Sequence, residues 1–182
     1  MARGYRTAGA QRIHNALMCY VRDSDETSVN NFKMALSAAT DAEVTELSIN
    51  QDSVLHDILH LPAAIISRQD LANKEEIIQS KTSLLLSFLW NRIQDDNQLV
   101  ECLCTSKNSA GFTPLHDALI AGNSVNLSLY LELLRGCDPD LQTKVLTSAN
   151  AAGFTPLHSA LKEGNPDNVC LLYTSPSPRD RG

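Results

Sequence analysis

The sequence Gly111-Phe112-Thr113-Pro114-Leu115-His116 decides the fold of this chain, because the same six residues return at positions 153–158. The two copies lie 42 residues apart, and aligning positions 96–127 with 138–169 at that offset requires no gap. Of the 32 aligned pairs, 17 are identical. Internal repetition of this kind predicts a protein built from stacked repeat units.

Each copy predicts the start of a short helix. Thr113 suits the N-cap, because its hydroxyl can accept a hydrogen bond from an amide one turn inside the helix. Pro114 then falls at the first helical position, where the missing N–H costs nothing. Leu115 and Ala118 begin an apolar stripe at helical spacing, and Gly122 predicts a left-handed end. The second copy predicts the same helix from Gly153, Thr155, Pro156, Leu157 and His158.

Helical spacing of apolar residues continues outside the two copies. It predicts helices over 11–21, after a cap at Thr27 or Ser28, after a cap at Thr40 or Asp41, and over 71–93. No segment shows the sustained alternation of a strand. The predicted fold class is therefore all-α.

A weaker copy of the motif precedes the other two. Positions 52–59 align with 112–119, but Ser53 replaces the threonine and Val54 replaces the proline. We therefore divide the chain into an N-terminal helical segment (1–48) and a repeat array (49–169). The array contains a degenerate copy at about 50–95, a full copy at about 96–137 and a truncated copy at 138–169.

Composition limits the classes of function. The net charge of −6 argues against a nucleic-acid partner, which would require a basic face. The apolar run 84–90 lies between Lys81 and Arg92 and is too short to cross a membrane. Five irregularly spaced cysteines, and the lack of an apolar signal stretch near the N-terminus, favour a reducing, cytoplasmic location.

The motif, the later glycines and the leucine-rich segment between them resemble the ankyrin repeat, a unit of roughly 33 residues. The resemblance covers about residues 50–169 and implies an ankyrin-type helical solenoid whose neighbouring units share a core. The 42-residue unit is longer, and Asp138-Pro139 predicts an added helix in place of the usual β-hairpin. Asp117 and Ser159 stand where the family usually has an apolar residue.

The resemblance implies a module that binds another protein through its concave face, with no catalysis and no cofactor. Phe112 and Phe154 are the most interesting candidates, because aromatic anchors dominate interface energetics. The alternative is that both rings pack between units. In this family the contact residues flank the motif; transferred by position, they are Ser109, Ala110, Phe112, Ile120, Ala121, Ala151, Ala152, Phe154, Lys162 and Glu163.

Two further hypotheses belong to other classes. Long, irregular units are similar to those of ankyrin proteins of intracellular bacteria. The chain is then the recognition arm of a longer enzyme, or of an effector exported into a host cell, with its catalytic domain beyond position 169. The second hypothesis is a metal site, because His56 and His60 have the ligand spacing of a zinc peptidase. However, Asp57 stands where that motif requires Glu, and the repeat already explains His56 as the equivalent of His116.

Residues 170–180 end the repetition in mid-unit and look like the in-frame translation of a transposase-type sequencing adaptor. We therefore expect 170–182 to be a non-native tail and the natural chain to be cut at Val169. The run Ser175-Pro176-Ser177-Pro178 is alternatively an extended linker or a phosphorylation site. The last unit is expected to lack its second helix and to fray from about Gly153 onward.

Overall fold

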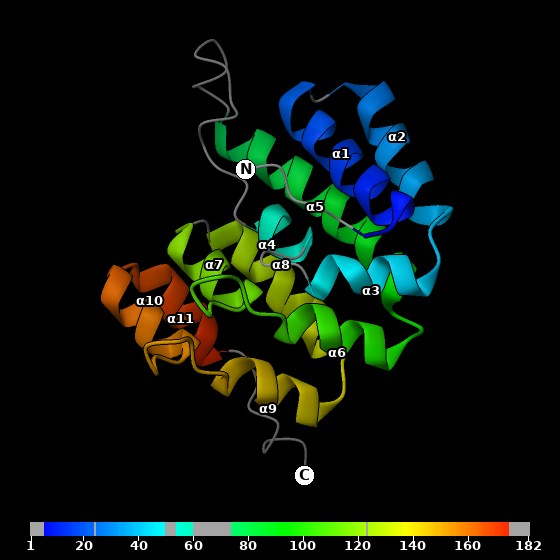
Figure 1. The fold of residues 1–182 in the computed structure, drawn as a ribbon. Coiled ribbons are helices and arrows are strands. Elements are labelled where there is room, and N and C mark those ends of the chain that lie inside the picture. Colours follow the sequence, from blue (N-terminus) through cyan, green and yellow to red (C-terminus); the bar gives the residue numbers. More distant parts are fainter. Residues whose placement is uncertain (1–5, 24, 50–53, 60–73, 123, 175–182) are drawn as a thin grey trace.

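A computed structural model describes residues 6–23, 25–49, 54–59, 74–122 and 124–174 of the 182-residue chain (Figure 1). Every regular element in these ranges is a helix, so the all-α prediction is confirmed. No helix in the described ranges is both long enough and apolar enough to cross a bilayer. The helices are α1 (Ala8–Asp23), α2 (Glu26–Ser37), α3 (Asp41–Ile49), α4 (Val54–Leu59), α5 (Lys74–Ile93), α6 (Asn97–Thr105), α7 (Pro114–Ile120), α8 (Ser124–Arg135), α9 (Pro139–Thr147), α10 (Pro156–Glu163) and α11 (Pro166–Thr174).

Three pairs of helices stack in sequence order. We call α4 with α5 the first unit, α7 with α8 the second unit, and α10 with α11 the third unit. The first helices of successive units pack together, α4 against α7 and α7 against α10 (Figure 1). The second helices do the same, α5 against α8 and α8 against α11. This is a helical repeat fold, and α4 takes the place predicted for the degenerate copy.

The apolar stripe of the motif forms the core between units. Leu115, Ala118 and Leu119 of α7 are fully buried. Leu127 and Tyr130 of α8 are also fully buried and belong to the same core. Burying one large apolar side chain contributes about 1.5–3 kcal/mol, so the stripe stabilises the stack strongly.

The predicted extra helix is present in two copies, α6 and α9. Each lies between the second helix of one unit and the motif loop of the next, and the two helices pack against each other. Asp96 caps α6 by accepting from the amide of Gln98 at 3.0 Å, and Asp138 caps α9 by accepting from the amide of Asp140 at 2.8 Å. An ion pair between Lys144 and Glu101 also joins the two helices.

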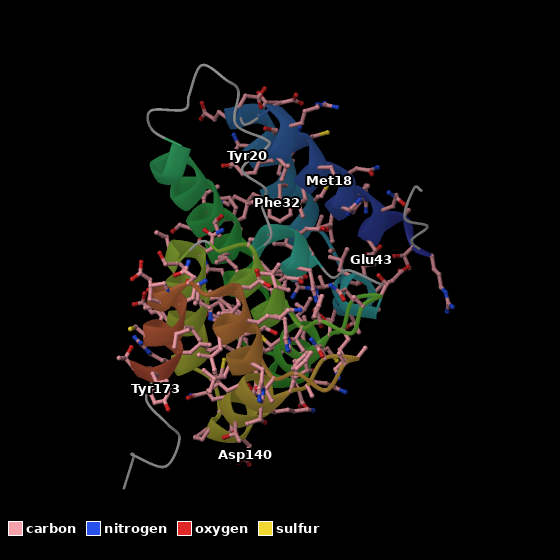
Figure 2. All side chains as sticks on the ribbon, turned by 90° about the vertical axis from the view of Figure 1, so that its left-hand side faces the viewer. Met18, Tyr20, Phe32, Glu43, Asp140 and Tyr173 are labelled. Atoms are coloured by element: carbon pink, nitrogen blue, oxygen red, sulfur yellow. The ribbon has the colours of Figure 1, made fainter. Side chains whose placement is uncertain are left out.

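The N-terminal helices cover the first unit. Helix α2 packs on α5, α3 packs on α4 and α6, and Phe32 and Tyr20 are buried within this group (Figure 2). The guanidinium of Arg92 in α5 donates to the carbonyl oxygen of Ala39 at 2.9 Å and so ties the group to the array. The predicted cap of α2 is wrong by two residues or more. Asp25 occupies the cap and accepts from the amide of Ser28 at 2.7 Å.

The third unit differs from its predicted form. Helix α11 follows α10 and packs against both α10 and α8, so the prediction that this unit lacks a second helix is wrong. The predicted boundary at Val169 lies inside α11, and Leu171 and Leu172 pack against the core. The outer face of α10 is nevertheless open, because Leu157 is 36% and Leu161 is 59% exposed. Their equivalents in α7 are fully buried.

Candidate functional site

The candidate site lies between the second and third units, where two equivalent loops lead into α7 and α10. In the first loop Asn108 holds the turn, because its side-chain oxygen accepts from the amides of Ala110 and Phe112, each at 3.0 Å. In the second loop Asn150 accepts from the amides of Ala152 and Phe154 at 2.9 and 3.0 Å. The two loops therefore present corresponding residues in the same orientation.

The glycine of each loop has a left-handed backbone, with φ of 76° at Gly111 and 82° at Gly153. The loops also touch each other. The ammonium of Lys107 donates to the carbonyl oxygen of Ala149 at 2.7 Å. Gly111 lies so close to the next loop that a Cβ built on it would be 2.6 Å from the amide nitrogen of Ala151. The close approach of the loops brings the predicted contact residues of both units together.

In the first and second units, a histidine bonds to the loop of the next unit. Nε2 of His56 lies 2.9 Å from the carbonyl oxygen of Phe112, and Nε2 of His116 lies 3.0 Å from the carbonyl oxygen of Phe154. A carbonyl oxygen can only accept, so Nε2 carries the proton in both rings. The histidines of the motif therefore fix the spacing of the loops.

The other nitrogen of His116 bonds within its own unit. Nδ1 accepts from the amide of Thr113 at 3.2 Å, and the Thr113 hydroxyl lies 2.8 Å from the same atom. Because Nε2 holds the proton, Nδ1 is unprotonated and the hydroxyl donates to it. The same hydroxyl also accepts from the backbone amide of His116, so the predicted cap is part of a capping box.

Burial lowers the pKa of His116 below its ordinary value of 6.5, and the positive charge of Lys107 acts in the same direction. The hydrogen bond to the Phe154 carbonyl opposes both effects. The ring is therefore neutral at neutral pH. This is the form that the two hydrogen-bonding roles of the ring require.

The loops and helix ends enclose a groove of about 370 Å³. Eight of the ten residues predicted to contact a partner line it, and Ser109 and Ala121 are the two that do not. The structure adds Asn150 and Ser159, which the sequence reasoning did not include. The residues that define the groove are Ala110, Phe112, Ile120, Asn150, Ala151, Ala152, Phe154, Ser159, Lys162 and Glu163.

The two phenylalanine rings are placed differently. Phe112 is half-buried, and its ring centroid lies 5.8 Å from that of His116. Phe154 is 45% exposed, and its centroid lies 6.1 Å from that of His158. Each ring packs on the histidine of its own motif and still lines the groove. Neither ring is buried within a core between units.

The two residues that depart from the family pattern have polar roles here. Asp117 is buried and accepts from the side-chain amide of Asn108 at 3.2 Å, so it braces the first loop. Ser159 stands at the equivalent position in α10 and lines the groove. Asn108 and Asn150 could have been found in the sequence, since they are identical at the 42-residue offset and three residues before each glycine.

The histidine of the metal-site hypothesis has another role. His56 is buried, and its Nε2 proton is directed at the Phe112 carbonyl, so this nitrogen cannot bind a metal ion in that state. His60 lies outside the described residues. In the part of the chain that the structure describes, no group of three or more histidine, cysteine or acidic residues is placed to hold a metal ion.

A family model for the ankyrin repeat matches residues 110–144. This segment is an ankyrin repeat. It begins in the motif loop, includes α7 and α8 and ends within α9. No curated protein matches the chain. Ankyrin repeats are in general protein-interaction modules, and the groove adjoins this repeat.

Proposed function

We propose that the chain is a protein-interaction module without catalysis of its own, and that the groove binds a segment of another protein. The observation that carries this proposal is that the groove gathers eight of the ten residues that the ankyrin resemblance assigns to partner contact. Two of these, Phe112 and Phe154, present aromatic surface from successive units. Aromatic side chains at the centre of a contact supply much of the binding energy in protein interfaces.

The lining indicates the chemistry of the partner segment. Alanine side chains from both loops leave room between the two rings, so one large apolar side chain can enter there. Lys162 and Glu163 lie at the C-terminal end of α10 and can pair with polar groups on either side of that anchor. We therefore expect a segment with one apolar anchor and polar flanks.

Selection from a displayed peptide library tests the proposal without a known partner. Peptides are selected on the wild-type chain and then measured on the double variant Phe112→Ala, Phe154→Ala. Binding should weaken about tenfold or more, because truncating an anchor residue in an interface typically costs at least 1–2 kcal/mol. Met34→Ala provides the matched control, since Met34 is an exposed large apolar residue on α2, outside the groove.

Circular dichroism should show that the double variant stays helical, because both rings are at least partly exposed. The proposal is wrong if the selected peptides bind the double variant as tightly as the wild type. It is also wrong if Met34→Ala weakens peptide binding as much as the double variant does.

A further inference from the structure

Two polar residues that line the groove are buried but incompletely bonded. Asn150 is 8% exposed and Ser159 is 7% exposed. The side-chain oxygen of Asn150 accepts from two loop amides, but its Nδ2 donates to no group in the described part of the chain. Within the same ranges the hydroxyl of Ser159 has no hydrogen-bond partner. Buried polar groups are normally hydrogen-bonded, so this pair of groups indicates a ligand.

The second unit shows where these two groups point. Asn108 makes the same two bonds to its loop amides as Asn150 does, so the two side chains have the same orientation. Nδ2 of Asn108 donates to the carboxylate of Asp117 at 3.2 Å. Ser159 stands at the position of Asp117, 42 residues later, and its side chain is one bond shorter. Nδ2 of Asn150 is therefore directed at Ser159 across a gap that aspartate closes in the second unit.

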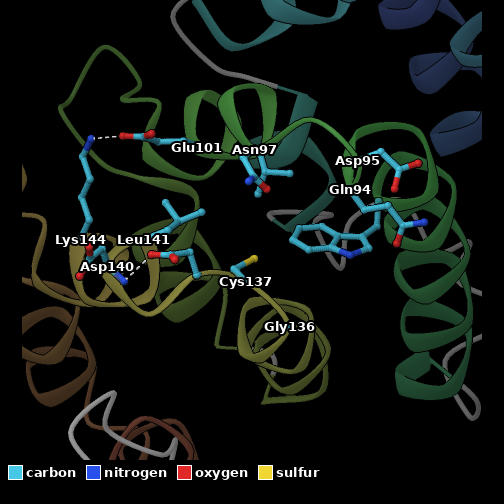
Figure 3. A pocket seen from close by; sticks show the side chains of 12 residues that line it. Gln94, Asp95, Asn97, Glu101, Gly136, Cys137, Asp140, Leu141 and Lys144 are labelled. Atoms are coloured by element: carbon cyan, nitrogen blue, oxygen red, sulfur yellow. Dashed lines mark hydrogen bonds and ion pairs between the residues drawn. The ribbon is translucent and has the colours of Figure 1, made fainter.

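A larger cleft, at the other ends of α6 and α9, has no such pair. Its volume is about 470 Å³, and Trp90, Cys137 and Lys144 are among the residues that line it (Figure 3). None of the polar residues in its lining is buried, and Asp95 and Asp140 lie at opposite ends (Figure 3). Of these two clefts, the groove alone presents buried polar groups without a partner in the described structure.

The two groups match a side-chain carboxamide. Nδ2 of Asn150 can only donate, whereas the Ser159 hydroxyl can also accept. A carboxamide carries its accepting oxygen and its donating nitrogen on one carbon, so both can face the pair together. A main-chain peptide group cannot do this, because its C=O and N–H point in opposite directions in the trans form.

Other side chains fit the pair less well. A carboxylate could accept from both groups, but burying an ionised group costs free energy unless a positive charge compensates it. The groove carries one lysine and one glutamate, and the whole chain has a net charge of −6. An apolar side chain would cover both groups and leave them unpaired. The chemistry of the pair therefore favours a neutral amide.

We propose that Asn150 and Ser159 bind the side-chain carboxamide of a glutamine or asparagine on the partner segment. The amide of Asn150 donates to the carboxamide oxygen, and the carboxamide nitrogen donates to the Ser159 hydroxyl. This inference rests on the proposed function and names one of the polar flanks of the apolar anchor. The rings of Phe112 and Phe154 hold the anchor, and the polar pair selects the flank.

Peptides selected on the wild-type chain provide the probes. They should carry glutamine or asparagine at a fixed spacing from an apolar residue. Replacing that glutamine by methionine, which has a similar length, should weaken binding about tenfold, because two hydrogen bonds are lost and buried groups stay unpaired. Replacement by glutamate should weaken binding as well, since a carboxylate cannot donate to Ser159.

The variant Ser159→Asp recreates the pair of the second unit. The new carboxylate should take the amide of Asn150 and close the gap, so the selected peptide should bind about tenfold more weakly. Helical circular dichroism should be kept, because Asp117 occupies the same position in α7. Ser159→Ala removes only the hydroxyl and should weaken binding about threefold to tenfold. Ser37→Ala, an exposed serine of α2 outside the groove, is the matched control and should bind as the wild type does.

The side-chain amide signals of ¹⁵N-labelled protein report on the bond itself. Those of Asn150 should shift when the peptide binds. Those of Asn108 should stay in place, because this amide is already bonded to Asp117.

Three results would overturn the inference: no enrichment of glutamine or asparagine, equal binding of the methionine peptide, or wild-type affinity in Ser159→Asp. Enrichment of glutamate or aspartate instead would show a carboxylate site and would overturn it too. If binding depends on Phe112 and Phe154 but not on the carboxamide, this inference alone fails. If the double phenylalanine variant binds normally, or if no peptide is selected, the proposed function fails with it.

Discussion

His116 is the single residue that does most to join two units. Its ring is fully buried and bonds to Thr113 in its own unit and to the Phe154 carbonyl in the next. His116→Ala leaves these groups unpaired and creates a cavity, so we expect a loss of about 2–4 kcal/mol in the free energy of unfolding. Urea denaturation measures this loss.

His158 provides the matched control for this experiment. It has the same bond to Thr155, at 2.7 Å from hydroxyl to Nδ1, but it is exposed and has no contact at Nε2 in the described structure. We therefore expect His158→Ala to cost about 1 kcal/mol or less. Equal losses in the two variants would show that the bond to the next unit contributes nothing.

The lowered pKa of His116 makes stability depend on pH. The unfolded chain binds the proton near pH 6.5, the ordinary pKa, and the folded chain binds it only at lower pH. The contribution of the neutral ring to the free energy of unfolding is therefore complete above pH 6.5. It is lost as the pH falls through the pKa that His116 has in the folded chain. Denaturation midpoints between pH 7.5 and about pH 5 should fall more steeply for the wild type than for His116→Gln. Parallel curves would contradict this assignment.

At the residue scale the scaffold residues were predictable from the sequence, but not all of their bonds were. The cap at Thr113 and the turn before Gly111 follow from local preferences, which act within a few residues of sequence. The partners of the histidines lie 38 or 56 residues away along the chain, so no local rule could name them. Asn108 and Asn150 were predictable in part. Their identity at the 42-residue offset shows that they belong to the repeat, but it does not show that they hold the loops.

At the scale of elements, the two equivalent loops allow the same substitution to be compared at two positions, Gly111 and Gly153. Gly111→Ala and Gly153→Ala each place a side chain on a left-handed backbone, which costs about 1 kcal/mol. Only at Gly111 would the new Cβ also meet the neighbouring loop, at 2.6 Å from the amide nitrogen of Ala151. At Gly153 nothing lies within 4 Å.

We therefore expect Gly111→Ala to destabilise the chain by about 1–3 kcal/mol more than Gly153→Ala, because the overlapping atoms must shift. Thermal or urea denaturation of the two variants measures the difference. Similar losses in both variants would mean that the loops do not approach each other as closely as described.

The existence of the helices was predictable at this scale because their caps and apolar spacing are strong. Even α6 and α9 were indicated, since Asp138-Pro139 is a typical helix start. The cleft lined by Trp90, Cys137 and Lys144 was not predictable. It forms where α5, α6, α8 and α9 meet, and which sides of these helices face one another is decided by packing between units.

At the scale of the whole molecule, the two ends of the array differ. Helices α1–α3 cover the first unit, whereas the outer face of α10 exposes Leu157 and Leu161. Amide hydrogen exchange should therefore be faster in α10 and α11 than in α7 and α8. Because α11 covers part of α10, we expect the amides of α10 to be less protected than those of α7 but more protected than those of an unfolded segment. Protection in α10 equal to that in α7 would contradict this gradient.

The covering of the first unit could not be derived from the sequence. The first 48 residues carry no copy of the motif, so their helices were predictable but their position on α5 and α6 was not. The end of the third unit could not be derived from the sequence either. The repetition stops at Val169, yet α11 continues across that point because Leu171 and Leu172 pack against the core.

The groove between the second and third units carries the central claim, and chemical-shift mapping tests it most directly. A peptide selected on the wild-type chain is added to the ¹⁵N-labelled protein, and amide shifts are followed residue by residue. We predict the largest changes in the loops at 110–112 and 151–154 and at Lys162 and Glu163. Changes confined to α1–α3, with these loops unaffected, would contradict the account.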